Sequence, residues 1–369
     1  MNILVLSWRD PKHPMSGGAE QVMHEHMKGW ILAGHKVTLF ASAFGGKKTE
    51  VLDGVTIIRQ GRQILGVHLK ACIWYITGKH ENFDLVVDQF HGIPFFTPLY
   101  VRAKKLAVVQ EVARNVWLKN HLPSPFNWIF GIVGYVTEPL YYLFYKNVPF
   151  MTGSASALKD LESIGISAKQ ITIVPHGVKL SLPKQLPQKE KVQTIIFLGA
   201  IAKDKGIEDA LKAFSILSKC GNYQFWVVGK AGEVYLSEVK RITDQLGLTK
   251  NSIFWGFVSE QKKFELLSKA HIMINPSAHE GWGLVNIEAN SVETPVIAYP
   301  SAGLVDSVKN NESGIITKDS TPESIATDVT RVLSDQKLYK KLQKGAQKWS
   351  QQFTWPSSQE KSLDLIESL

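Results

Sequence analysis

Apolar residues along the chain follow two alternating patterns. Short apolar runs predict buried strands, and longer stretches with apolar residues three and four apart predict helices. The first unit of this kind is a strand at 3–8, a glycine-containing turn at 11–18, a helix at 19–32 and a strand at 36–41. Such an alternation predicts a parallel sheet covered on both faces, with ligands at the carboxyl ends of the strands.

The same plan continues along the first half and then begins again in the second half. Further strands are predicted at 55–59, 85–88, 106–110 and 171–174, and then at 194–198, 224–228, 253–256 and 296–299. The segment 179–191 between the two halves is rich in Pro, Lys and Gln, which is typical of a linker. We therefore expect an N-terminal domain at 1–178, a linker at 179–191, a C-terminal domain at 192–350 and a final helical segment at 351–369.

Composition places the chain among ordinary globular proteins. Of its 369 residues, 44% are apolar and 20% are charged, and this length suits two domains with separate cores. Cys72 and Cys220 form neither a disulfide framework nor a metal-ligand pattern, and they fit a reducing compartment. The first strand begins at once, so we expect no signal peptide and a cytoplasmic location.

The net charge of +9 favours anionic partners. Nucleotides and anionic lipid fit this charge, whereas no motif predicts binding to nucleic acid. The segment 116–145 is rich in aromatic residues, with basic residues at either end. Two interpretations remain open for it, contact with a membrane surface or lipid-linked acceptor and a place in the N-terminal core.

One strand–turn–helix stretch, at 275–289, carries the candidate chemistry. Gly281 and Gly283 mark a turn after a buried strand, and the helix that follows presents backbone N–H groups that suit a phosphate. Glu280 lies in the turn, and Glu288 lies about 7–8 Å further along the helix axis than Gly283. Carboxylates accept hydrogen bonds from sugar hydroxyls. The pattern therefore indicates a nucleotide-sugar site, and the alternative is an ordinary turn with two surface glutamates.

The amino-acid sequence of this stretch resembles a known signature. Glu280-Gly-Trp-Gly-Leu-Val-Asn-Ile-Glu288, followed by Thr294-Pro-Val-Ile-Ala298, is similar to the E-x7-E motif of retaining glycosyltransferases of the GT4 type. The resemblance implies the GT-B fold, with two Rossmann-like α/β domains facing a central cleft. It places the donor sugar at Glu280 and the ribose at Glu288, and it places the diphosphate on the backbone of Gly281, Trp282, Gly283, Leu284 and Val285.

The resemblance assigns further residues to the site. It implies that Lys205 contacts the diphosphate, that the backbone of Gly256, Phe257 and Val258 meets the base, and that Gly17 and Gly18 close on the donor. It implies acceptor contacts for Glu20 and Arg114, the latter in a segment similar to His-Gln-x-Ala-Arg-Glu-x-Trp. Gln110 stands at the position of that histidine, which lines the reaction centre in many relatives, so the residues implied to be catalytic are Glu280, Lys205 and Gln110. We expect the neighbouring His24 and His26 to be surface residues.

Three positions depart from the family pattern. Ala200 and Val305 stand where arginines are usual, and Gln110 can donate a hydrogen bond but cannot exchange a proton. A missing guanidinium removes a two-pronged phosphate contact, and Lys203 is a candidate to replace it as a point charge.

We therefore predict a retaining glycosyltransferase of the hexosyltransferase type that works without a cofactor and without a metal ion. The co-substrate would be a UDP or GDP type nucleotide sugar, and the acceptor a glycan, a lipid-linked sugar or a small molecule, as in polysaccharide or glycolipid biosynthesis. Peripheral membrane contact would accompany a lipid-linked acceptor, under the first of the two interpretations of the segment 116–145. The alternative is a weakened or inactive relative that binds nucleotide or glycan as a partner protein, because of the three departures.

Overall fold

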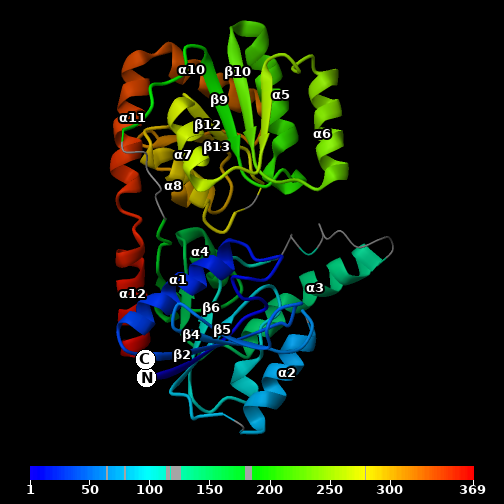
Figure 1. The fold of residues 1–369 in the computed structure, drawn as a ribbon, viewed down its shortest axis with the longest axis vertical. Helices are drawn as coiled ribbons and strands as arrows, with labels where there is room; N and C mark the ends of the chain where they lie inside the picture. Colours follow the sequence, from blue (N-terminus) through cyan, green and yellow to red (C-terminus); the bar gives the residue numbers. More distant parts are fainter. Residues whose placement is uncertain (64, 79, 114–116, 118–125, 179–184, 279) are drawn as a thin grey trace. The chain divides into compact units, whose positions relative to one another are not determined.

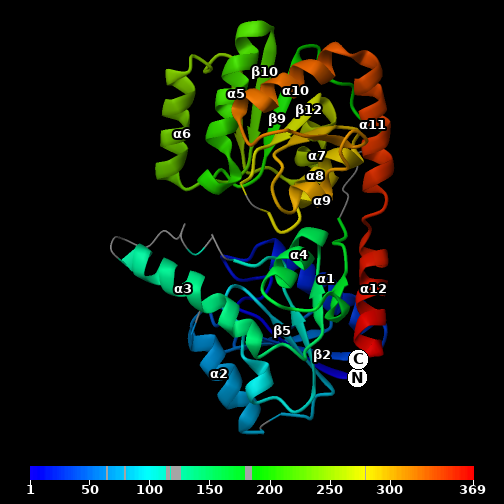
Figure 2. The ribbon, with the colours of Figure 1, turned by 180° about the vertical axis from the view of Figure 1, so that it is seen from behind.

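The chain forms two compact units, each built around its own sheet, in a computed structural model that describes residues 1–63, 65–78, 80–113, 117, 126–178, 185–278 and 280–369. One unit comprises Met1–Gly177 together with Trp355–Leu369, and the other comprises Val178–Thr354 (Figures 1 and 2). Both are α/β units with mainly parallel sheets, as the alternating pattern predicted.

The first unit has an eight-stranded sheet in the order β3-β4-β2-β1-β5-β6-β7-β8. All neighbouring strands are parallel except β3 and β4. The edge strand β3 alternates between exposed and half-buried residues, so it carried no apolar run for sequence reasoning to find. The strands are β1 (Asn2–Leu6), β2 (Lys36–Ala41), β3 (Thr49–Leu52), β4 (Val55–Arg59), β5 (Leu85–Gln89), β6 (Lys104–Val108), β7 (Phe150–Thr152) and β8 (Ile171–Ile173).

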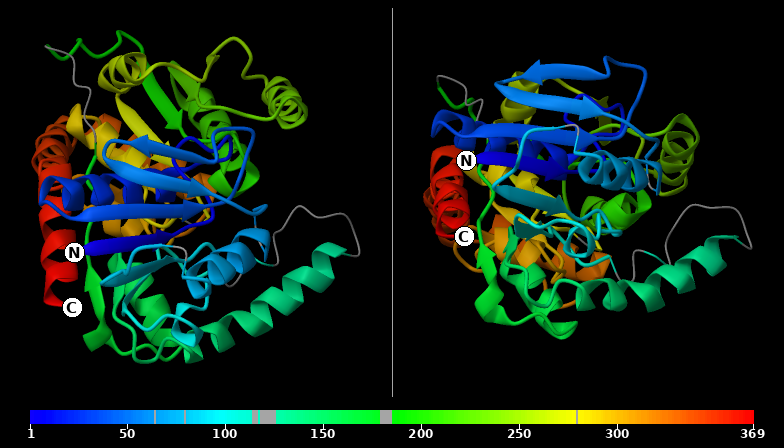
Figure 3. Two further views of the ribbon diagram at one scale, coloured as in Figure 1. Left: turned by 60° about the horizontal axis from the view of Figure 1, so that its bottom comes forward. Right: turned by 90° about the horizontal axis from the view of Figure 1, so that it is seen from below.

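Helices cover both faces of this sheet. Ile3 and Val5 pack with the layer that contains α1 and α12, whereas Leu4 and Leu6 pack with α2 on the opposite face, since successive strand residues point to opposite sides. The α1–α12 pair and the helices α2 and α3 can be followed in Figure 3. The helices are α1 (Gly18–Leu32), α2 (Leu65–Ile76), α3 (Phe126–Leu143), α4 (Ala155–Ser163) and α12 (Trp355–Ser368).

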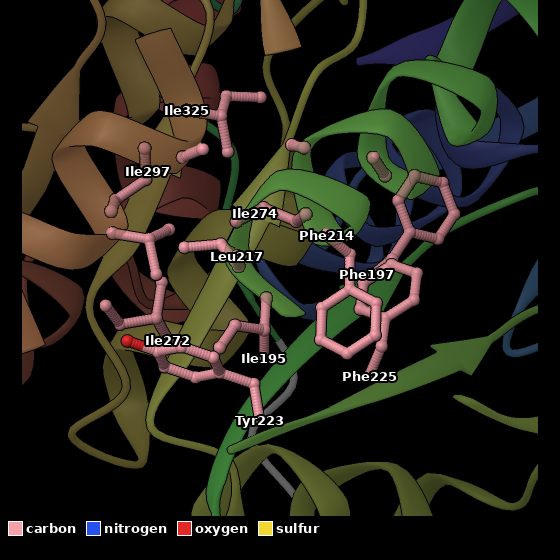
Figure 4. Packing of buried hydrophobic residues seen from close by; sticks show 14 of the residues in the cluster. Ile195, Phe197, Phe214, Leu217, Tyr223, Phe225, Ile272, Ile274, Ile297 and Ile325 are labelled. Carbon is pink, nitrogen blue, oxygen red and sulfur yellow. The ribbon is translucent and has the colours of Figure 1, made fainter. Parts of the chain in front are cut away.

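The second unit has a six-stranded parallel sheet in the order β11-β10-β9-β12-β13-β14. Its largest core cluster joins Phe197 and Phe225 of the sheet to Phe214 of α5 (Figure 4). The strands are β9 (Gln193–Leu198), β10 (Tyr223–Val228), β11 (Ser252–Gly256), β12 (Ile272–Asn275), β13 (Val296–Ala298) and β14 (Gly314–Ile316). The helices are α5 (Ile207–Cys220), α6 (Glu233–Gln245), α7 (Glu260–Lys269), α8 (Leu284–Ser291), α9 (Leu304–Ser307), α10 (Pro322–Ser334) and α11 (Gln336–Ser350).

The last helix, α12, packs along α1 in the first unit. Trp30 Nε1 donates to Ser362 Oγ at 3.1 Å, and Gln359 Nε2 donates to the Glu25 carbonyl at 2.9 Å. This packing explains why the expectation of surface histidines on α1 was wrong. His26 is buried with its ring edge-on to Trp355, and His24 is buried with Nε2 2.9 Å from Asp53.

Acid should weaken the first unit through its buried imidazoles. Burial lowers the pKa of His26 to about 3 and that of His176 to about 4. The unfolded chain takes up these protons near the ordinary value of about 6.5, so stability is complete above that pH and falls as the pH drops towards the folded values. Each imidazole then costs roughly 2 kcal/mol at pH 5.

The measurement is urea unfolding at pH 7 and at pH 5 for the wild type and His26→Gln. The variant should lose about 2 kcal/mol less than the wild type between the two pH values, because one proton uptake is removed. Equal losses in the two proteins would contradict this assignment.

Candidate functional site

The candidate site of the second unit lies where the strand order reverses. From β9 the chain moves outward to β10 and β11 on one side, and it then returns to place β12 on the other side of β9. The loops that follow β9 and β12 therefore leave the sheet at adjacent carboxyl ends in opposite directions. In open parallel sheets this reversal point is where ligands bind.

The loop after β9 is folded against the turn after β12. A single 3-10 turn, Lys203–Lys205, leads to Gly206 at φ +75°. A Cβ on Gly206 would lie 2.1 Å from the Pro276 carbonyl oxygen, so only glycine permits this approach. The Ala278 N–H donates to the Asp204 carbonyl at 3.0 Å. These backbone contacts bring Lys205 to the glutamate turn.

Glu280 receives two side-chain hydrogen bonds there. Lys205 Nζ donates to Glu280 Oε1 at 2.8 Å, and Ser277 Oγ donates to the same oxygen at 3.0 Å. The backbone of Glu280 is also fixed, since its N–H donates to the Ala302 carbonyl at 3.3 Å. A Cβ on Gly303 would lie 2.1 Å from the Glu280 carbonyl oxygen. The carboxylate is thus held beside a cation at the mouth of the turn.

The turn ends at the N-terminus of α8. Gly283 precedes the helix at φ +86°, a left-handed conformation that favours glycine. Asn286 in the first turn is buried and fixed on both sides, accepting from Asn275 Nδ2 and donating to Ser307 Oγ, each at 2.8 Å. The N–H groups of Leu284 and Val285 belong to the helix start, which has no intrahelical acceptors for them. A rigid set of amide donors therefore lies next to the Lys205–Glu280 pair.

Trp282 takes no side-chain part in this arrangement. Its ring is buried in an apolar cluster with Val178, Ile287 and Phe353. Only its backbone is then available to a ligand, as the resemblance implied for this stretch.

Glu288 lies on α8 in a largely covered position, unlike the freely exposed glutamate that an ordinary turn and helix would carry. Its side chain is only 13% exposed and pairs with Lys263 Nζ at 2.7 Å. Burial raises the pKa of Glu288, and Lys263 opposes the rise. Its second oxygen, Oε2, is buried and accepts no hydrogen bond from any described residue. Such an oxygen suits a hydroxyl donor from a ligand.

Gly256 ends the edge strand β11, and Phe257 and Val258 follow it. Gly256 has φ +68°, and its carbonyl accepts from the Gly229 N–H at 2.9 Å, which joins this loop to the end of β10. Phe257 is 83% exposed, whereas Val258 packs against the core. The exposed ring and the open backbone are the groups that this loop offers to a ligand.

The positions of the missing arginines are open to solvent. Ala200 is exposed directly after Gly199, and Val305 is 45% exposed. Lys203 is exposed on the 3-10 turn that also carries Lys205. Lysines on one short turn therefore supply the basic side chains of the β9 loop.

The candidates of the first unit gather at the start of α1. Gly17 is the N-cap residue and Gly18 begins the helix, and Glu20 Oε2 accepts from the Gly17 N–H at 2.7 Å. The Glu20 carboxylate is buried, with its other oxygen 3.6 Å from Arg9 Nη1 and 3.8 Å from His91 Nε2. Glu20 therefore fixes the glycine loop and two neighbouring side chains.

Gln110 follows β6 by two residues, and its Oε1 is buried without a hydrogen-bond partner among the described residues. This open acceptor is compatible with a ligand contact. Arg114 lies outside the described residues.

Sequence reasoning missed the aromatic and basic residues around Glu20. Trp8 stacks on His91 with ring centroids 5.6 Å apart. Burial lowers the pKa of His91 to about 4. Both residues follow neighbouring strands, because β1 pairs with β5. That adjacency at the strand ends was the available signal, and it requires the strand order to be known.

Among the described residues, no group of three or more His, Cys, Asp or Glu side chains could hold a metal ion. None of the described helices combines the length and the apolar character needed to cross a bilayer.

Comparison with known families accounts for nearly the whole chain. Residues 16–182 match the model described as Glycosyltransferase Family 4, and residues 178–349 match the model described as Glycosyl transferases group 1. The chain belongs to the family 4 glycosyltransferases. It is an enzyme of the GT-B fold class, as the glutamate signature predicted.

Individual relatives agree with this assignment. The chain is 27% identical to an uncharacterised glycosyltransferase of Methanocaldococcus jannaschii over 91% of its own length and 90% of that protein. It is 29% identical to a 2-deoxystreptamine glucosyltransferase of Streptomyces kanamyceticus over 74% of its own length and 68% of that protein. A sucrose-phosphate synthase from Thermosynechococcus elongatus has a similar fold, with a TM-score of 0.81 and 19% identity over 100% of this chain and 98% of that one.

Gly303→Ala should destabilise the second unit by distorting the glutamate turn. Gly303 and Gly247 both have positive φ, +75° and +72°, but a Cβ on Gly303 meets the Glu280 carbonyl oxygen whereas a Cβ on Gly247 meets nothing within 4 Å. Both changes add backbone strain, and the clash should cost at least about 2 kcal/mol more. Urea unfolding of Gly303→Ala against Gly247→Ala measures this difference, and equal losses would argue against a close-packed turn.

Proposed function

We propose that this glycosyltransferase moves a hexose from a nucleoside diphosphate donor with retention of the anomeric configuration. The observation that carries the proposal is the Lys205–Glu280 pair beside the N-terminus of α8. A cation and a row of amide donors suit a diphosphate, and a fixed carboxylate suits the hydroxyls of the transferred sugar.

The roles proposed for the other residues follow from the groups that they leave unpaired. Glu288 Oε2 would accept from a ribose hydroxyl, since it is a buried acceptor without a partner among the described residues. Gly256, Phe257 and Val258 would meet the base. Donor binding then falls on the second unit, where Glu280, Lys205 and Glu288 all lie.

The chemistry proposed for the transfer depends on positioning and on charge. Lys205 would stabilise the negative charge that develops on the leaving diphosphate, together with the α8 amides. Lys203 would add a second positive charge where the family pattern has an arginine at Ala200. No metal ion or cofactor takes part in the proposed reaction.

The acceptor is proposed to bind in the first unit. Glu20 lies in the first turn of α1, and Gln110 offers a buried oxygen. Glycans, lipid-linked sugars and small hydroxylated molecules are the acceptor classes in view. The relative that is named as a 2-deoxystreptamine glucosyltransferase supports a hydroxylated acceptor and a hexose donor.

Lys205→Met should lower kcat/KM about 10-fold to 150-fold, the equivalent of losing one charged hydrogen bond. Purified protein is first incubated with UDP and GDP sugars, with and without candidate acceptors, and release of the nucleoside diphosphate is followed. Lys212→Met, an exposed lysine on α5 whose partner is Asp209, is the matched control and should be unchanged.

Glu280→Gln should reduce turnover more than Lys205→Met does. It should leave the stabilisation of the protein by UDP or GDP in place, because the carboxylate is assigned to the sugar. Glu265→Gln, a surface glutamate paired with Lys262 and Lys269, is its control. Nuclear magnetic resonance of the product gives the anomeric configuration. Inverted product would refute retention, and nucleotide binding without turnover of any donor would favour a non-catalytic relative.

A further inference from the structure

Helix α3 has its apolar residues on the outside. The residues that it buries are Gly131, Gly134, Glu138 and Tyr142, and they share one face at spacings of three and four. Trp128 on the outer side is 64% exposed. More than a third of the side chain is likewise exposed at Ile129, Phe130, Ile132, Val133, Tyr135, Val136, Leu140 and Leu143. A helix at the surface of a globular protein normally has the opposite arrangement.

Specific contacts fix α3 in this orientation. A Cβ on Gly134 would lie 2.4 Å from the ring of Trp117, so the glycine leaves room for that ring. Glu138 is buried and accepts from Trp117 Nε1 at 3.1 Å and from the Ala113 N–H at 2.8 Å. Rotating the helix to bury its apolar side would break these hydrogen bonds, and Glu138 would lose the partners that compensate for its burial. The outward orientation of the apolar side chains is therefore fixed by specific contacts.

The neighbouring helix α2 shows a second apolar stripe. Leu65, Leu69, Ile73 and Ile76 lie at helical spacing and are all exposed. Both helices cover the same face of the first sheet. Leu6, Asp88 and Ala107 are in register on neighbouring strands, so their side chains point to the same face. Leu6 packs with α2, and Ala107 packs with the end of α3. Figures 1 and 2 show α2 and α3 on one side of this unit.

The charges near these stripes select the partner. The exposed residues of α3 carry no charge, and Glu138, its one acidic residue, is buried. The described part of the surrounding segment 101–146 has only Glu111 as a further acidic residue, against four basic ones, Arg102, Lys104, Lys105 and Lys146. Arg62 is exposed just before α2, and Lys70 is exposed within it. An uncharged apolar surface with basic residues around it complements an anionic lipid surface.

The shape of the apolar surface favours a bilayer over a protein. On α3 the exposed side chains occupy most of the circumference between Trp128 and Val136, which is broader than the narrow seam by which two helices pair. Trp128 and Tyr135 are of the residue types that prefer the region of the lipid headgroups.

We propose that the outer sides of α2 and α3 form a membrane-docking surface, with α3 lying in the headgroup region of an anionic bilayer. The proposal goes beyond sugar transfer and does not depend on which donor or acceptor is used. It would keep the first unit at the lipid surface without a membrane-spanning segment.

Vesicle flotation of the full chain tests the proposal. Wild-type protein should float with vesicles of phosphatidylcholine mixed with phosphatidylglycerol, bind much less to phosphatidylcholine alone, and lose binding as salt is raised. Ile132→Glu and Val136→Glu should each weaken binding at least about tenfold, since each replaces an exposed apolar side chain that would enter the bilayer with a negative charge.

Leu32→Glu on α1 and Val234→Glu on α6 are the matched controls, because both replace exposed apolar residues elsewhere. They should bind vesicles as the wild type does. Release of nucleoside diphosphate by the four variants without vesicles should be unchanged, which separates this test from that of sugar transfer.

Equal vesicle binding by all four variants would overturn the proposal. A second result would also overturn it. The wild type would fail to bind vesicles and would sediment as a dimer, and Ile132→Glu and Val136→Glu would dissociate that dimer. The surface would then join two copies of the chain.

Discussion

Lys205 and Glu280 meet because two neighbouring parallel strands end side by side. The two strands are β9 and β12, and the loops that carry the pair follow them.

 

The paired side chains themselves stand 75 positions apart in the chain, and it is the order of the strands that brings them together. Opposite charges at 2.8 Å on two loops hold those loops in one arrangement and leave a cation facing the start of α8. The other features of the site depend on that arrangement.

Close backbone approaches make the pairing possible. Gly206 lies against the Pro276 carbonyl and Gly303 lies against the Glu280 carbonyl, in both cases without room for a Cβ atom. The loops are thus packed at backbone distance, and this packing fixes the amides at the start of α8. Fixed donors of this kind are suited to stabilising charge on a leaving group. Because alanine and valine occupy the two arginine positions of the family pattern, the proposed diphosphate site depends more on this fixed geometry.

The first unit uses its two sheet faces differently. One face is covered by α1 and α12, which bury Trp30 and His26 between them and so make the end of the chain part of this unit. The opposite face carries α2 and α3, whose outer sides remain apolar. The aromatic segment is therefore divided, since Tyr142 and Tyr145 are core residues, as one interpretation of the sequence expected, whereas Trp128 is exposed.

The sequence by itself determined the α/β class, most of the strands and the glutamate turn, because strand periodicity and glycine placement are local properties. It also indicated the family, since the spacing of Glu280 and Glu288 is contained in nine consecutive residues. Only the tertiary structure decided that Glu288 pairs with Lys263 in a largely covered position, that His24 and His26 are buried, and that α3 presents its apolar side outward. Each of these depends on residues distant in the chain, and burial is set by what packs against a residue, which its own neighbours in sequence do not specify.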